Sequence, residues 1–150
     1  MGGVILVRIR RLGLGLVAGL ALVSCSSQTD SALADAQQVC TDLGYENGAS
    51  DRSDDSSAVD DWTSADWDDA EADLNDTANR AARAAREDRR WDRLSNAVTD
   101  LQAGAEPLAK IKDETLPQYD RDAAQAELDR LNPTEVLRVL DQECRKAQAR

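Results

Sequence analysis

Histidine is absent from this chain of 150 residues. Without an imidazole, Ser-His-Asp and Cys-His catalysis are excluded, and so are the usual zinc sites. The chain also lacks a glycine-rich phosphate loop and a G-x-G-x-x-G fingerprint. Catalysis by a pair of carboxylates stays open, but the 29 acidic side chains single out no particular pair. We therefore expect a protein that is not an enzyme and that carries no cofactor.

Phenylalanine is absent as well, and aromatic residues make up only 3% of the chain. A core must therefore be built from Leu, Val, Ala and three tryptophans, a composition more typical of helix packing than of a β-sandwich. No segment shows the alternation of apolar and polar residues that marks a strand. The sequence predicts an all-α fold, namely a small antiparallel helical bundle.

Positive charge is scarce, and the formal net charge is −11. Three of the 18 basic residues, Arg8, Arg10 and Arg11, lie near the N-terminus, where there are no acidic residues. The chain after residue 24 therefore has 15 basic against 29 acidic side chains, a charge of −14. Because phosphate binding needs a surplus of Lys and Arg at the contact, we expect no nucleic-acid partner.

The N-terminal segment is first basic and then apolar. Residues 12–23 form a run of Leu, Val, Ala and Gly that follows the three arginines. A helix that crosses the bilayer needs roughly 20 apolar residues, so a run of this length favours a cleaved export signal over a permanent span. An ordinary secretory signal and an uncleaved anchor are the alternatives.

The apolar run ends in Leu22-Val23-Ser24-Cys25, which resembles the lipobox of bacterial lipoproteins. The resemblance implies cleavage before Cys25 and a diacylglyceryl thioether on that residue, and such a group is sufficient for stable membrane anchoring. The excess of arginine over lysine resembles proteins of GC-rich, actinobacterial-type bacteria. We expect a protein held on the extracytoplasmic face of the cell membrane. Its expected segments are a signal peptide (1–24), a lipidated tether (25–31) and a helical domain (32–150).

Three cysteines leave an odd thiol in an oxidising compartment. If Cys25 is lipidated, its thiol is no longer free, and an even pair remains, Cys40 and Cys144, one near each end of the domain. Both lie on apolar faces at helical spacing. We predict a disulfide between Cys40 and Cys144 that closes the bundle, because a redox-active pair lacks the Cys-x-x-Cys spacing.

Cap and stop residues divide the rest of the chain into helices. The apolar positions from Ala58 to Leu101 keep helical spacing without proline or glycine, which predicts either one long rod or a helix broken near 74–79 or near Arg89. Asn132 is expected to cap the last helix. The other expected elements are a first helix that begins at Asp30 or Ser31 and ends near Leu43, a polar loop (46–57), a short helix with Leu108 and Ile111, and helices at 120–131 and 132–148.

The segment 51–73 is strongly acidic and suggests a cation site. Asp51, Ser53 and Asp55 repeat at every second residue, as at the start of an EF-hand calcium loop. Ser56 stands where the turn glycine belongs, however, and Trp62 stands where the closing glutamate belongs. We favour a solvated acidic loop and keep a calcium site at Asp51, Ser53 and Asp55 as the alternative.

A stripe of six arginines follows at a spacing close to three. We expect these side chains to pair with Glu87, Asp88, Asp92 and the acidic segment inside the bundle. The alternatives are contacts of the stripe with anionic lipid headgroups or wall polymers, or with a protein partner. The stripe consists of Arg80, Arg83, Arg86, Arg89, Arg90 and Arg93, of which the first three are the candidate contact residues.

The three tryptophans have two different expected roles. In a chain with so few large apolar residues, we expect Trp67 and Trp91 to fill the core. Trp62, next to the polar loop, is the candidate for an exposed contact residue, because tryptophan is frequent among the residues that dominate interfaces.

These observations predict a membrane-anchored extracytoplasmic lipoprotein that acts as a binding or accessory module, with an envelope protein as its partner or with a structural role. The alternative is a lipoprotein that binds calcium or another small ligand through segment 51–73.

Overall fold

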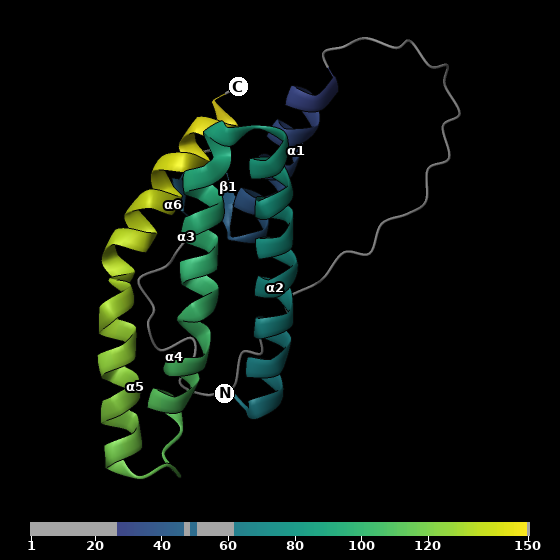
Figure 1. Ribbon diagram of the computed structural model, residues 1–150. Coiled ribbons are helices and arrows are strands. Elements are labelled where there is room, and N and C mark those ends of the chain that lie inside the picture. The colour runs from purple at the N-terminus through teal and green to yellow at the C-terminus, as the bar shows by residue number, and fades with distance from the viewer. Residues whose placement is uncertain (1–26, 47–48, 51–61, 150) are drawn as a thin grey trace.

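A computed structural model describes residues 27–46, 49–50 and 62–149, and these residues are almost entirely helical (Figure 1). The predicted all-α class is confirmed. None of the described helices is long and apolar enough to cross a bilayer. The elements are α1 (Ser27–Asp42), β1 (Tyr45–Glu46), β2 (Ala49–Ser50), α2 (Ser64–Glu87), the 3-10 helix η2 (Arg89–Trp91), α3 (Asp92–Ala103), α4 (Ala105–Lys112), α5 (Gln118–Leu131) and α6 (Pro133–Gln148).

The helices form three long columns and one short one (Figure 1). The long columns are α2, α3 continued by α4, and α5 continued by α6. Helix α1 is the short column and lies against the C-terminal half of α2, with Asp42 of α1 paired to Arg80 of α2. Helices α1 and α2 run antiparallel, because the other end of α1 is tied to the last turn of α2 by a hydrogen bond from the Ser31 hydroxyl to Glu87.

The buried core lies in the half of the bundle that contains α1. Small side chains dominate it, so the helices approach one another closely. Trp91 of η2 is its largest member and is 1% exposed, which confirms its predicted place in the core. The core consists of Ala32, Ala36, Val39, Cys40, Tyr45, Ala81, Ala84, Trp91, Leu94, Ala97, Val98, Val136, Leu140, Cys144 and Ala147.

A disulfide joins α1 to α6 inside this core. Cys40 and Cys144 are both fully buried, and their Cα atoms are 5.4 Å apart. The predicted pairing is therefore confirmed. Next to the bond, Glu143 is only 1% exposed, and its Oε1 lies 2.7 Å from Lys146 Nζ and 3.5 Å from Arg93 Nη1. Two cations thus compensate a carboxylate that would be costly to bury alone.

The long helical segment breaks near Arg89, at one of the two predicted places, and stays helical through 74–79. Asp88 is extended, with φ −147° and ψ 111°, and its carboxylate accepts the N–H of Arg90 at 3.0 Å. This side chain ends α2 and starts η2, so the chain folds back on itself and forms no rod. The cap of the last helix is also confirmed, because the Asn132 side chain accepts the N–H of Glu135 at 3.4 Å.

Two local predictions are wrong. The first helix begins at Ser27, before the expected cap at Asp30 or Ser31, and Asp30 instead lies in its first turn, where a negative charge is favourable. The loop expected from residue 46 contains the two-residue pairing of β1 with β2. Gly44, with φ +79°, ends α1 and turns the chain, and Tyr45 is buried with its carbonyl accepting the side-chain amide of Gln148.

Residues 27–149 contain all of the core named above and the disulfide. A segment with its own buried core folds as an independent unit. The soluble chain that begins at Ser26, called the domain below, is therefore suitable for solution measurements.

We predict that replacing both core cysteines, Cys40→Ser with Cys144→Ser, lowers the free energy of unfolding of the domain by about 2–5 kcal/mol, because the bond closes a loop of about 100 residues. The melting temperature, followed by circular dichroism, should fall by roughly 10 °C or more. Alkylation in urea without reductant should leave both wild-type cysteines unlabelled. Labelling of either one under these conditions would contradict the pairing.

Candidate apolar ligand cavity

The bundle has a gap because its columns differ in length. Helix α1 has 16 residues and α2 has 24, which correspond to about 24 Å and about 36 Å at 1.5 Å per residue. Since α1 lies against the C-terminal half of α2, no part of α1 reaches the other half. In that half, the bundle consists of three columns only, namely α2, the column of α3 and α4, and the column of α5 and the start of α6. Because no fourth helix covers them, Leu74, Leu101 and Leu128 remain only partly buried.

A cavity of about 400 Å³ occupies this half of the bundle. Among the described residues that line it, Asp100 alone carries an ionisable side chain. This volume is typical of pockets that hold small molecules. The lining residues of this apolar cavity are Trp62, Trp67, Ala70, Leu74, Asp100, Leu101, Gly104, Ala105, Leu108, Leu128, Leu131, Pro133, Val136 and Leu137.

Two chain junctions shape the wall of the apolar cavity. At the junction of α3 and α4, a Cβ added to Gly104 would lie 3.4 Å from Leu128 Cδ1, so the glycine lets α5 approach closely. At the junction of α5 and α6, Asn132 adopts the left-handed conformation with φ 49°, which asparagine tolerates better than most residues. Leu131 and Pro133, the residues on either side of Asn132, both line the cavity.

Two tryptophans form one edge of the apolar cavity. The ring centroids of Trp62 and Trp67 are 4.7 Å apart, with an angle of 65° between the planes. Trp62 is 39% exposed, as expected, and Leu137 is 38% exposed. The prediction that Trp67 fills the core is wrong, because its ring is only partly buried and lines the cavity.

A capping box places the two tryptophans at the start of α2. Asp66 accepts the backbone N–H of Thr63 at 2.7 Å and the Thr63 hydroxyl at 2.6 Å, and the Asp66 N–H points back to the Thr63 hydroxyl at 3.4 Å. The hydroxyl of Thr63, and then its backbone N–H, lower the pKa of Asp66 below the ordinary 3.8. The box fixes the first turn of α2 and thereby the positions of Trp62 and Trp67 on either side of it.

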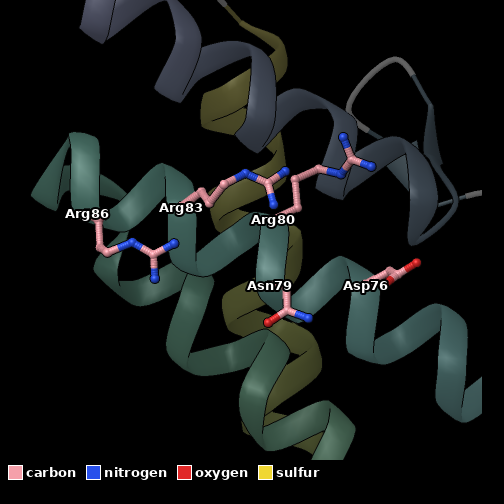
Figure 2. A pocket seen from close by; sticks show the side chains of 5 residues that line it. All are labelled: Asp76, Asn79, Arg80, Arg83 and Arg86. Atoms are coloured by element: carbon pink, nitrogen blue, oxygen red, sulfur yellow. The ribbon is translucent and has the colours of Figure 1, made fainter.

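Arg80 and Arg83 of the arginine stripe pair with partners other than those expected. Arg80 lies 3.5 Å from Asp42 and 4.0 Å from Asp35, and Arg83 lies 3.3 Å from Asp35, so the carboxylates come from α1. Figure 2 shows Arg80 and Arg83 extending toward α1, while Arg86 does not. The described part of the acidic segment, residues 62–73, forms no ion pair with Arg80 or Arg83, because these two side chains lie where α1 packs on α2.

Of the other four arginines of the stripe, two form ion pairs and two form none among the described residues. Arg90 pairs with Asp88, as expected, and Arg93 with the buried Glu143. Within the described part of the chain, no ion pair involves Arg86 or Arg89. Of the three candidate contact residues, Arg80 and Arg83 therefore hold α1 against α2. Arg86 is the only one of the three whose guanidinium has no carboxylate partner among the described residues. An open hollow beside it is lined by Asp76, Asn79, Arg80, Arg83 and Arg86.

The remaining candidate residues cannot be placed. Cys25, Asp51, Ser53 and Asp55 lie outside the described residues. Within residues 27–46, 49–50 and 62–149, no group of three or more Cys, Asp or Glu side chains is arranged to hold a metal ion.

The chain matches no protein-family model, no curated protein and no solved structure. Its function must therefore be inferred from the cavity itself.

We predict a pH effect at the capping box. Because folding lowers the pKa of Asp66, the box adds stability above the ordinary pKa of 3.8 and loses that contribution as the pH falls through the lower folded value. Thr63→Val should raise the pKa of Asp66, measured by NMR titration of its carboxyl group. Thr99→Val, which removes an unrelated exposed hydroxyl, should leave it unchanged. An Asp66 pKa that is equal in wild type and Thr63→Val would contradict the box.

Proposed function

We propose that this protein is an extracytoplasmic lipoprotein, anchored through Cys25, whose helical domain binds a small apolar molecule and does not catalyse a reaction. The observation that carries the proposal is the apolar cavity, with a volume of about 400 Å³ and a single ionisable side chain in its described lining. Binding is favoured over catalysis because acid–base chemistry needs positioned titratable groups, whereas Asp100 is an exposed residue at the edge.

Burial of hydrocarbon supplies the binding energy. Each methylene removed from water contributes about 0.8 kcal/mol, so a chain of about ten methylenes supplies the roughly 8 kcal/mol of micromolar binding before the entropic cost of association is subtracted. All described lining residues except Trp62 and Gly104 lie on helices, so we expect the cavity to be largely formed before the ligand arrives. A preformed cavity loses little conformational entropy when it binds.

The proposed anchor holds the cavity away from the membrane. Helix α1 begins at Ser27, so a single residue separates it from Cys25. The start of α1 lies beside the end of α2, where Ser31 contacts Glu87, whereas the apolar cavity lies beside the start of α2. The lipid would thus be attached where α1 begins and α2 ends, with the cavity toward the opposite end of the bundle.

We predict that the domain binds N-phenylnaphthylamine, whose fluorescence rises in apolar surroundings, saturably and with one site. Ala70→Phe fills part of the cavity and should weaken binding at least tenfold. The same change should raise the melting temperature, because filling a cavity adds buried apolar contacts. The matched control is Ala72→Phe, two residues along α2 at an exposed position, which should bind like wild type.

A second variant guards against misfolding of the first. Ala105→Phe fills the cavity from the opposite wall, at the start of α4, and should weaken binding in the same way. The proposal is wrong if the probe does not saturate, or if folded Ala70→Phe and Ala105→Phe both bind it as wild type does.

The anchor has an independent test in the full chain. In a bacterium that processes lipoproteins, the wild-type protein should partition into the detergent phase of Triton X-114, whereas Cys25→Ser should remain unprocessed or leave the membrane. Cys40→Ser should remain lipid-anchored, because it changes a cysteine inside the domain. A processed Cys25→Ser form that is retained like wild type would refute lipid anchoring.

A further inference from the structure

The half of the bundle that contains the apolar cavity carries most of the negative charge of the domain. Residues 62–76 and 100–138 include every described lining residue of the cavity and have 15 acidic against 5 basic side chains, a net charge of −10. The other described residues, 27–46, 49–50, 77–99 and 139–149, have 9 acidic against 8 basic side chains, a net charge of −1. The arginine stripe lies in this second part and compensates its acids, whereas no comparable group of cations surrounds the cavity.

Asp100 of α3 brings this negative charge to the cavity itself. Among the described lining residues it alone has an ionisable side chain, and no ion pair within the described part of the chain involves it. A second hollow, of about 310 Å³, lies mainly between α3 and α6 and shares Asp100, Leu131 and Val136 with the apolar cavity. We call it the side hollow. Asp100 therefore lies at the border between the apolar cavity and the side hollow.

The other two charged residues of the side hollow, Arg93 and Glu135, are already paired. Arg93 Nη1 lies 3.5 Å from Oε1 of the buried Glu143, and Glu135 is bound by Arg138. Asp100 is thus the one carboxylate at this border that has no counter-ion among the described residues. A positive charge beside Asp100 would be attracted without first breaking an existing ion pair, whereas a negative charge would be repelled.

The tryptophan edge of the apolar cavity has the same preference. The faces of the indole rings of Trp62 and Trp67 carry partial negative charge and attract cations. The net charge of −10 around the cavity also raises the local concentration of cations and lowers that of anions, within about 10 Å at moderate salt. An apolar molecule that ends in a carboxylate or a phosphate is therefore disfavoured in this cavity.

We infer that the ligand is a lipophilic cation, whose apolar part lies in the apolar cavity and whose positive charge lies beside Asp100. This inference rests on the proposed function and adds the charge class of the ligand to it. The charge would be that of a protonated amine or of a quaternary ammonium group. Because Asp100 is an exposed residue, such a group keeps part of its hydration shell when it binds and avoids the full cost of burying a charge.

Probes with one hydrocarbon chain and different charges test the inference. Decyltrimethylammonium, decanoate and uncharged decanol are titrated into the domain by calorimetry near neutral pH, each below its micelle concentration. At about 20 mM salt the cation should bind at least fivefold more tightly than decanoate, and the ratio should shrink at about 0.5 M salt because screening weakens both effects. A smaller ratio at low salt overturns the inference but leaves the apolar cavity as a binding site if decanol binds. Binding of none of the three probes overturns the proposed function as well.

Two aspartates of α3 locate the charge of the ligand. Asp100→Asn should weaken binding of decyltrimethylammonium about two- to fivefold, the range expected for an exposed ion pair, and should leave decanol binding unchanged. Asp92→Asn removes the same charge from the first turn of α3, away from the cavity lining, and should alter neither. Equal effects of the two variants on the cation, or no effect of Asp100→Asn, would contradict placement of the charge beside Asp100.

A cavity-filling variant separates binding in the cavity from attraction to the acidic surface. Ala70→Phe keeps every charge and fills part of the apolar cavity, so it should weaken binding of decyltrimethylammonium at least tenfold. If folded Ala70→Phe binds the cation as wild type does while decanol binding is lost, the cation binds elsewhere and the inference is wrong.

Discussion

The packing of a short helix α1 on longer columns is the constraint from which the rest of the structure follows. Two kinds of contact hold α1 in place, namely the buried disulfide to α6 and the ion pairs of Asp35 and Asp42 with arginines of α2. Both act over the same half of the bundle. That half is closed and dry, and the half beyond the reach of α1 is left with three columns around a space that their side chains do not fill.

Composition reinforces this division. The closed half is packed largely with alanine, and residues such as Ala36, Ala81 and Ala84 are fully buried because small side chains let helices approach closely. The open half relies on leucine and on two tryptophans at its edge, in a chain without phenylalanine. Apolar residues that remain partly exposed around an unfilled space lower stability, and the proposed ligand would cover them.

Much of the fold could be predicted from local signals. The helical class and the Asn132 cap follow from periodicity and from residues that act on their immediate neighbours, and the disulfide follows from counting cysteines. The break at Asp88 is only one of the alternatives that the periodicity left open, beside a break at 74–79 and an unbroken rod. The apolar cavity could not be predicted, because it results from the relative lengths and positions of helices far apart in the sequence. The partners of Arg80 and Arg83 were misassigned for the same reason, since acidic residues nearer in sequence were available. Trp67 was expected in a core because its apolar spacing does not reveal whether a neighbouring helix covers it.

The disulfide has a consequence for the integrity of the protein after a proteolytic cut. The exposed turn between α4 and α5, around Thr115, is the kind of site at which a peptide bond is cut first. Because Cys40 and Cys144 enclose that turn and every loop from β1 to the start of α6, a single cut there leaves both fragments covalently joined. A nicked molecule would therefore keep its C-terminal helix attached to α1 until this one bond is reduced.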